Sequence, residues 1–318
     1  MKEIDFNEFK GIMVGNAENS KAGTGCTVAI CPEGATAGVD VRGGAPGTRE
    51  ISLLSPEKMI QKIHAILLTG GSAYGLDAAS GVMEYLSEKN IGYGVGNIKV
   101  PIVPGAVLFD LVVGSNEIRP DSQMGYQACQ SAGESSIEQG NIGAGTGATI
   151  GKYGKPERAM KGGLGFKAFQ VGELKVGALV VVNCLGDIYD PEEGRIIAGS
   201  LDENGLTANS IDDIVKDFNK KEQNFGNTTL GIVFTNGKIT KTEANKIASI
   251  AHNGYGQTII PSHTNFDGDT IFVMATGKVE SNLELMNLLA VKSVAGAVLN
   301  GVKQATSSYG FMSYNDIR

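Results

Sequence analysis

The sequence predicts an α+β fold in which sheets stack on one another and helices cover the outside. Segments rich in β-branched and apolar residues mix with helical segments, without the regular strand–helix–strand rhythm of a doubly wound parallel sheet. Near the C-terminus, two strands at 229–237 and 269–277 bracket one helix at 241–256. Residues 211–226 look like a linker, but the part that follows holds too little sheet to fold alone. We therefore expect residues 1–318 to form one domain.

Several elements are expected in the first part of the chain. Residues 23–44 predict two strands joined by a turn at 32–34, where proline, glutamate and glycine follow one another. Residues 55–64 open with Ser-Pro, a usual start of a helix, and predict a short one. The apolar run at 65–71 ends in two glycines and predicts a buried strand. Residues 73–88 carry apolar side chains at helical spacing and predict a helix.

The second half contains the clearest boundary signals. Residues 172–188 are strongly β-prone. Thr240 and Glu243 have the spacing of a capping box, which predicts the start of the helix between the two C-terminal strands. Ser281 and Glu284 have the same spacing and predict the start of the last long helix.

Composition excludes several classes of protein. With 318 residues, 42% hydrophobic and 19% charged, the chain is expected to be a soluble globular protein with a substantial core. Its net charge of -7 argues against a nucleic-acid partner. No run of about 18 apolar residues predicts a membrane span, and no secretory signal is visible at the start. We therefore expect a cytoplasmic protein.

Metal and cofactor sites are not expected. The four cysteines match neither a zinc site nor a disulfide framework by spacing, and three histidines offer few ligands. Residues 143–148 match a dinucleotide fingerprint, but a polar segment precedes them where a strand is required. Gly151-Lys152 lacks the flanking residues of a phosphate-binding loop. The 45 glycines instead predict tight contacts between layers, or many functional turns.

The residues that remain for catalysis point to a threonine. The sequence has no Gly-x-Ser-x-Gly elbow, and its histidines suggest no triad; His64 and His263 are expected in surface, core or turn roles. A threonine without a histidine can use its own α-amine as base if it becomes an N-terminus. That amine has a reference pKa of about 7.7–8.0, so a useful fraction of it is neutral at cytoplasmic pH. Thr228 stands where a polar stretch turns abruptly into a predicted strand, directly after Asn227.

Nine segments carry a resemblance to a known family. They are collinear and span nearly the whole chain: GGAPGTRE (43–50), LLTGGSAYGLDAASGV (67–82), VPIVPGAVLFDL (100–111), RPDSQMGYQAC (119–129), GAGTGATIGK (143–152), KGGLG (161–165), VGALVVVNCLGDI (176–188), GNTTLGIVFTN (226–236) and HTNFDGDTIFVMATG (263–277). With them the chain resembles the self-processing aminopeptidases and amidases. That family includes L-aminopeptidase/D-esterase, the β-peptidyl aminopeptidases and the nylon-oligomer (6-aminohexanoate) endo-hydrolase.

The resemblance implies a four-layer α-β-β-α sandwich, built as a single domain from two self-cleaved fragments. It places the cut between Asn227 and Thr228, giving fragments 1–227 and 228–318 that stay together. Thr228 would be the nucleophile and its freed amine the candidate base. Family members generally form homo-oligomers, and a tetramer is the form that the resemblance favours.

Four further residues match positions of the family site. Asn183 matches the asparagine that can donate its amide to the oxyanion, and Lys152 matches a lysine of the nylon-hydrolase branch. Asp267 and Asp269 match a paired acidic motif that orients the nucleophile and its amine. Without the resemblance, a surface turn is the better explanation of Asp-Gly-Asp and a solvated loop charge the better explanation of Lys152, whereas a polar residue at a strand end explains Asn183 equally well.

The function expected is hydrolysis of short peptides or amino-terminal amides, as an aminopeptidase or an amidase of amino-acid oligomers. The residues do not choose among α-peptides, β-peptides, D-esters and ω-amino-acid oligomers. Two alternatives stay open: an acyltransferase that uses the same threonine, and an uncleaved scaffold without catalysis. No cofactor or metal is expected.

Overall fold

The computed structural model describes residues 1–318 except 154–155, 204, 206, 208–214, 216–225 and 318. The predicted linker at 211–226 therefore lies almost entirely outside the described residues. The strands are β1 (Lys2–Glu3), β2 (Met13–Asn19), β3 (Thr24–Val41), β4 (Gly47–Arg49), β5 (Ile63–Thr69), β6 (Tyr93–Val95), β7 (Ile98–Val100), β8 (Gly105–Val107), β9 (Thr149–Ile150), β10 (Met160–Lys161), β11 (Leu164–Val171), β12 (Leu174–Val181), β13 (Asp187–Asp190), β14 (Arg195–Ala198), β15 (Leu230–Gly237), β16 (Ile259–Ile260) and β17 (Thr270–Val279). The α-helices are α1 (Ala78–Glu88), α2 (Ser122–Gln130), α4 (Lys241–Thr258) and α5 (Leu283–Lys303).

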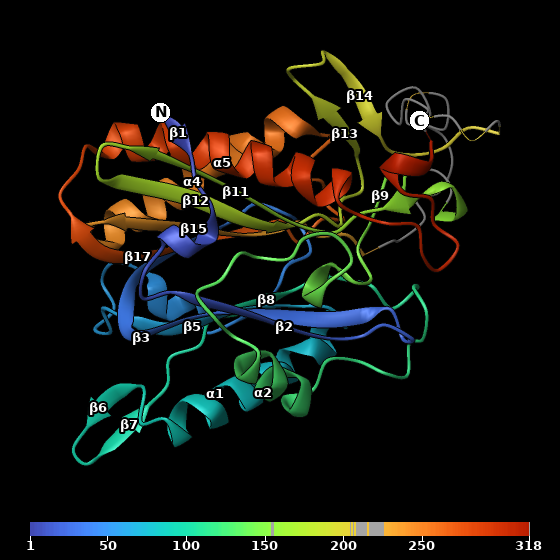
Figure 1. The fold of residues 1–318 in the computed structure, drawn as a ribbon. Helices are drawn as coiled ribbons and strands as arrows, with labels where there is room; N and C mark the ends of the chain where they lie inside the picture. The colour runs from blue at the N-terminus through green and yellow to red at the C-terminus, as the bar shows by residue number, and fades with distance from the viewer. Residues whose placement is uncertain (154–155, 204, 206, 208–214, 216–225, 318) are drawn as a thin grey trace.

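One large sheet organises the described part of the chain. Its strand order is β1-β11-β12-β15-β17-β3-β5-β8-β4, with β2 paired to β3 outside this path. The two halves of the long strand β3 pair differently: residues 36–41 pair with β17, whereas residues 24–30 lie between β2 and β5. In Figure 1 the two halves of the sheet lie one over the other, with α4 and α5 outside one half and α1 and α2 outside the other. The expected mixture of strands and helices in a single domain is confirmed.

Three clusters of buried apolar residues fill the spaces between these elements. One packs α4 and α5 against β12 and β17, and includes Val176, Ala248 and Val298. A second lies between the two halves of the sheet and contains Phe6, Phe234 and the apolar side chains around them. The third packs α1 and α2 against β3 and β5. The burial of apolar surface in these clusters is the main favourable term that holds the fold together.

Glycines allow some of these elements to approach unusually closely. A Cβ atom at Gly125 on α2 would lie 1.9 Å from the carbonyl oxygen of Ala78 on α1. A Cβ atom at Gly165 on β11 would lie 2.1 Å from the carbonyl oxygen of Ala297 on α5. Since no real Cβ tolerates such distances, part of the high glycine content serves tight packing between layers, as expected.

Most of the predicted elements are present. The strands β5, β12, β15 and β17 form where the sequence predicts strands, and β15 and β17 are parallel neighbours on either side of α4 in the chain. Thr240 and Glu243 form the expected capping box of α4. The predicted helix at 73–88 begins with a turn of 3-10 helix before α1. The four cysteines are buried free thiols, as expected.

Two expectations for the first part of the chain are wrong. Residues 24–41 form one strand, β3, not two: in place of the expected turn at 32–34 the strand continues through an irregularity between Ile30 and Ala35, and its second half passes from β5 to β17. Residues 55–64 do not form a helix, and His64 lies on β5. The backbone carbonyls of Lys58 and Ile60 accept hydrogen bonds from the Lys241 ammonium at 3.1 and 3.0 Å, which ties this segment to α4 as a loop.

The last helix corrects two further expectations. Its N-cap is Asn282, whose side chain accepts from the backbone of Leu285, so the predicted cap at Ser281 is one residue too early. Among the described helices, α5 is long and apolar enough to cross a membrane, contrary to the expectation from sequence. However, 61% of its most apolar stretch is buried inside the fold, where it packs on β11 and β12. Its hydrophobicity is explained by the core.

Candidate active site

The segment Asn227–Thr229 enters the centre of the sheet at the start of β15. Its backbone is fixed from both sides: the N–H of Asn227 donates to Phe266 at 3.2 Å, and the N–H of Thr228 donates to the carbonyl of Asn183 at 2.9 Å. The carbonyl of Asn227 accepts from the N–H of Gly268 at 3.0 Å. Asn227 and Thr228 are both buried. The bond between them is therefore held rigidly inside the fold, between β12 and the segment that leads into β17.

The Thr228 hydroxyl lies against the bond that precedes it. It donates to the carbonyl oxygen of Asn227. The space beside it is made by a glycine: a Cβ atom at Gly268 would lie 2.6 Å from Thr228 Oγ1. The absence of a side chain at Gly268, the middle residue of the Asp-Gly-Asp motif, thus leaves space for the Thr228 hydroxyl.

Asn183 lies two residues after the end of β12 and is fully buried. Its Oδ1 accepts from the backbone N–H of Thr149 at 3.0 Å and from the Lys152 ammonium at 2.9 Å. Both donors fix which way the amide group faces, because only its oxygen can accept a hydrogen bond. Its Nδ2 then donates to the carbonyl of Phe109 at 3.2 Å and keeps a second hydrogen for another acceptor.

Lys152 is buried, so the alternative of a solvated loop charge is wrong. Its Nζ donates to both the backbone and side-chain oxygens of Asn183, at 3.2 and 2.9 Å. Burial lowers the pKa of its ammonium to about 8, although Cys184, Asp267 and Asp110 oppose that change. The ammonium form still prevails at neutral pH.

The two carboxylates of Asp-Gly-Asp are also buried, so a surface turn is wrong here too. Asp267 Oδ2 accepts from the backbone and hydroxyl of Thr264 at 2.9 and 2.7 Å. Its Oδ1 is buried and has no hydrogen-bond partner among the described residues. Burial, and secondarily the charge of Asp269, raise the pKa of Asp267 to about 6. Oδ1 is thus a ready acceptor for a cation.

Asp269 holds the backbone next to the threonine. Its Oδ1 accepts from the N–H of Thr229 at 2.8 Å. Its Oδ2 lies 2.8 Å from Nδ1 of His263, a residue that sequence analysis assigned only to a turn. His263 does occupy a turn, with a positive φ of 59°, and this conformation directs its ring at the carboxylate. Its position only six residues before Asp269 is the one feature of the sequence that could have suggested this contact.

Phe109 and Asp110 are the other residues that sequence analysis missed. Both belong to the segment 100–111 that carried part of the resemblance, yet neither was singled out. The backbone carbonyl of Phe109 accepts a hydrogen bond from the side-chain amide of Asn183, and Asp110 is a buried carboxylate. Nothing in the local pattern distinguishes them from an ordinary strand end, because their partners are far away in sequence.

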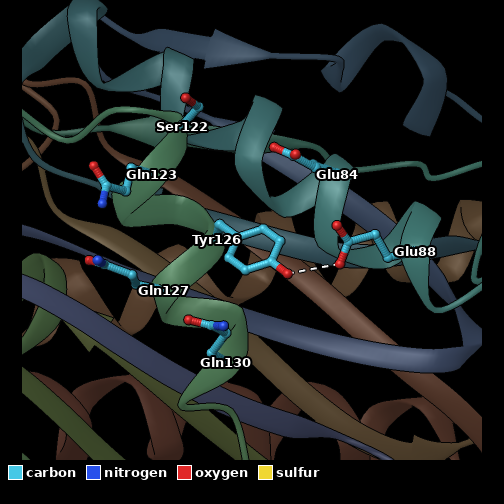
Figure 2. Close-up of a pocket in the computed structure, with 7 residues that line it drawn as sticks. All are labelled: Glu84, Glu88, Ser122, Gln123, Tyr126, Gln127 and Gln130. Carbon is cyan, nitrogen blue, oxygen red and sulfur yellow. Dashed lines mark hydrogen bonds between the residues drawn. The ribbon is translucent and has the colours of Figure 1, made fainter.

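A cavity of about 230 Å³ opens beside this cluster. Phe109, Thr149, Lys152 and Gly226 lie in its wall, together with the apolar side chains of Val112, Ala159 and Phe311 and with the exposed Glu157. A larger hollow of about 420 Å³ lies over α1 and α2. Figure 2 shows that carboxylates and amides line it, with Tyr126 donating to Glu88 at 2.8 Å. Its lining residues offer no buried nucleophile with a base, so the first cavity marks the candidate site.

Replacing Asp267 tests the electrostatics in an uncut chain. A carboxyl whose pKa is about 6 when folded and about 3.9 when unfolded costs stability as pH rises between these values. In a Thr228→Ala background, Asp267→Asn should therefore become the more stable chain above pH 6, by about 3 kcal/mol. Urea unfolding at pH 4 and pH 8 measures this. An equal stability gap at both pH values would contradict the raised pKa.

No cluster of three or more potential metal ligands occurs among the described residues. The candidate site brings together a threonine, an asparagine, a lysine and two carboxylates, all buried and all predicted from sequence. Their placement in one cluster is a finding, whereas their catalytic roles remain predictions.

Comparison with solved structures defines the class of fold. The L-aminopeptidase D-Ala-esterase/amidase of Ochrobactrum anthropi, described as a variant of the Ntn (N-terminal nucleophile) hydrolase fold, superimposes with a TM-score of 0.69. The match covers 95% of this chain and 86% of that one at 18% identity, so it concerns the fold alone. This chain therefore has an Ntn-hydrolase type of fold.

The chain belongs to peptidase family S58, whose profile matches residues 7–314. It is 39% identical over 316 residues to an uncharacterized aminopeptidase of Mycobacterium tuberculosis, covering 92% of this chain and 89% of the relative. It is also 34% identical over 278 residues to a 6-aminohexanoate-oligomer endohydrolase of Kocuria sp., covering 86% and 75%. The predicted resemblance is confirmed, and the protein is a hydrolase of peptide or amide bonds.

Proposed function

We propose that the protein cuts its own chain between Asn227 and Thr228, and then uses Thr228 as an N-terminal nucleophile on short peptides or amino-terminal amides. One observation carries the proposal: the buried Thr228 hydroxyl lies against the carbonyl of the very bond to be cut. The N–H of Gly268 donates to that same carbonyl oxygen, where negative charge would develop.

Self-cleavage needs one attack and one hydrolysis. Thr228 Oγ adds to the carbonyl carbon of Asn227, its proton passes to the departing nitrogen, and the peptide C–N bond breaks. This leaves an ester between the Asn227 carbonyl and Thr228 Oγ, with a free α-amine on Thr228. Water then opens the ester and gives Asn227 a carboxylate.

The fold explains why the fragments 1–227 and 228–318 would stay together. After the cut, β15 of the second fragment still pairs with β12 of the first, from Val176↔Thr235 to Val181↔Leu230. β17 likewise pairs with β3. We include in the proposal that the layers in Figure 1 are the four-layer α-β-β-α sandwich, formed as one domain by the two fragments.

In turnover the freed amine accepts the proton of the Thr228 hydroxyl as Oγ attacks the substrate carbonyl, and then protonates the leaving amine. Asp267 Oδ1, which has no other described partner, would hold the ammonium form. The free Nδ2 hydrogen of Asn183 would donate to the oxyanion, while the Lys152 ammonium holds Asn183 in that orientation. Water finally releases the acyl group from Thr228.

The names of relatives support aminopeptidase or oligomer-amidase activity, and the apolar cavity suits a short, mainly aliphatic acyl group. Cytoplasmic location is part of the proposal and is supported by four buried free thiols. Homo-oligomer assembly is also proposed. The hairpin β6–β7 exposes Val95 and Ile98, an apolar surface that such an assembly would cover, and sedimentation of the mature protein tests it.

The decisive experiment is the intact mass of the purified wild-type chain under denaturing conditions. We expect two fragments that meet at 227/228. A single full-length chain after long incubation would contradict self-cleavage and favour the uncleaved scaffold. Where fragments form, comparing transfer of the acyl group to an added amine with its hydrolysis separates an acyltransferase from a hydrolase.

A further inference from the structure

Two glycine-rich segments that the proposed chemistry does not use close over a buried carboxylate. Asp110 is only 1% exposed. A Cβ atom at Gly70 would lie 2.1 Å from Asp110 Oδ2, and one at Gly147 would lie 2.8 Å from its Cβ. Any larger residue at either glycine would collide with Asp110. The segments around Gly70 and Gly147 are therefore shaped to enclose this side chain.

Both oxygens of Asp110 accept hydrogen bonds inside this enclosure. The backbone N–H of Gly71 donates to Oδ1 at 2.7 Å, and the Thr24 hydroxyl donates to Oδ2 at 2.6 Å. Two accepting oxygens suit the ionised form. Burial raises the pKa of Asp110 to about 6, which still leaves it mainly ionised above neutral pH.

Asp110 is linked to the active site in two ways. The first link is covalent: Asp110 is the next residue after Phe109, and the Phe109 carbonyl accepts a hydrogen bond from the Asn183 amide at 3.2 Å. The ring of Phe109 also packs on Gly226, the residue before Asn227: a Cβ atom at Gly226 would lie 2.5 Å from Phe109 Cγ. Through space its charge attracts the Lys152 ammonium and opposes the effect of burial on that lysine.

We propose that Asp110 is a positioning residue: its carboxylate, held by Gly71 and Thr24, anchors Phe109 so that Asn183 faces the oxyanion, and it is one of the two buried carboxylates whose charge favours the ammonium form of Lys152. The inference rests on the proposed function for its catalytic meaning. Its electrostatic part concerns the folded chain alone and can be tested without any cleavage.

Other charged and titratable groups face this pair. Asp267 and Cys184 face Lys152, and burial raises the pKa of the Cys184 thiol far enough to keep it neutral. Lys161 faces Asp110 from β10, with its Nζ donating to the carbonyls of Gly145, Ala148 and Gly162. The test must therefore separate the charge of Asp110 from that of Asp267.

Asp110→Asn removes the charge and keeps the shape. The new Oδ1 can accept from Gly71, and the Thr24 hydroxyl can rotate to accept from the new amide. Thr24→Val is the matched control, since it removes a hydrogen bond to the same carboxylate and leaves the charge in place. Both are made in the Thr228→Ala chain, and the Lys152 ¹³Cε resonance is followed against pH by NMR.

We expect the pKa of Lys152 to fall by about one unit with Asp110→Asn and to stay within a few tenths of a unit with Thr24→Val. With Thr228 intact, Asp110→Asn should slow self-cleavage at pH 8 at least tenfold, as followed by intact mass. An unchanged Lys152 titration in Asp110→Asn overturns the proposal. If wild type is never cut but Lys152 does shift, only the proposed function fails.

A second measurement covers an Asp110→Asn chain that does not fold. In Thr228→Ala/Asp267→Asn, the Lys152 resonance should show a small inflection near pH 6, where Asp110 takes up its proton, before the main titration of the lysine itself. Absence of that inflection also overturns the proposal.

Discussion

Thr228→Ala should leave the chain in one piece and abolish amide hydrolysis. Without the hydroxyl, no ester can form at the Asn227 carbonyl, so the α-amine at position 228 is never released. Because nucleophile and base are lost together, we expect hydrolysis to fall on the order of 10⁴-fold or more. Intact mass measures the first effect, and release of amine from an amide that wild type hydrolyses measures the second.

The neighbouring threonine supplies the matched control for this change. Thr229 is buried beside Thr228, and its Oγ1 has no hydrogen-bond partner among the described residues. Thr229→Val keeps the shape and the backbone N–H that donates to Asp269, so this variant should still cut itself. Thr228→Ser should also cut, since it keeps a hydroxyl. A fragment boundary at 227/228 in Thr228→Ala would exclude this hydroxyl as the nucleophile.

Local signals in the sequence predicted the elements that depend on near neighbours. The capping box of Thr240 and Glu243 predicts the start of α4 because both hydrogen bonds form within one turn. The apolar runs of β5 and β15 predict buried strands because the centre of the sheet offers no polar surface. Thr228 could be found for a similar reason, since polar residues give way to a buried strand at that point.

Distant contacts decided what local signals could not. Residues 55–64 begin with a helix-start signal, but two of their backbone carbonyls accept hydrogen bonds from Lys241 on α4. No pattern within the segment reveals that partner. Asp110 follows an apolar segment like many strand ends, and its importance comes from Gly70 and Gly147, far apart in the chain. The resemblance to a family supplied Asn183 and Lys152, which local pattern alone could not select.

Gly268→Ala should slow self-cleavage about 100-fold. The backbone of Gly268 does not have a positive φ, so alanine can adopt its conformation. Its methyl group, however, would lie 2.6 Å from Thr228 Oγ1 and 2.9 Å from the carbonyl oxygen of Ala45. The hydroxyl must move, and since Gly268 also donates to the Asn227 carbonyl, the attacked group shifts with it. A displacement of about 1 Å in a reacting group costs about 100-fold in rate.

The measurement for Gly268→Ala is the fraction of cut chain against time, by intact mass, with Gly256→Ala as the matched control. Gly256 lies within α4, and a Cβ atom there would meet nothing within 4 Å, so alanine should leave cleavage unchanged and strengthen the helix slightly. If Gly268→Ala were cut at the wild-type rate, the hydroxyl could not be attacking from its position beside Gly268. The Asp-Gly-Asp motif would then stabilise the fold without positioning the nucleophile. Slow cutting combined with a wild-type unfolding midpoint is the result that assigns this glycine to the reaction.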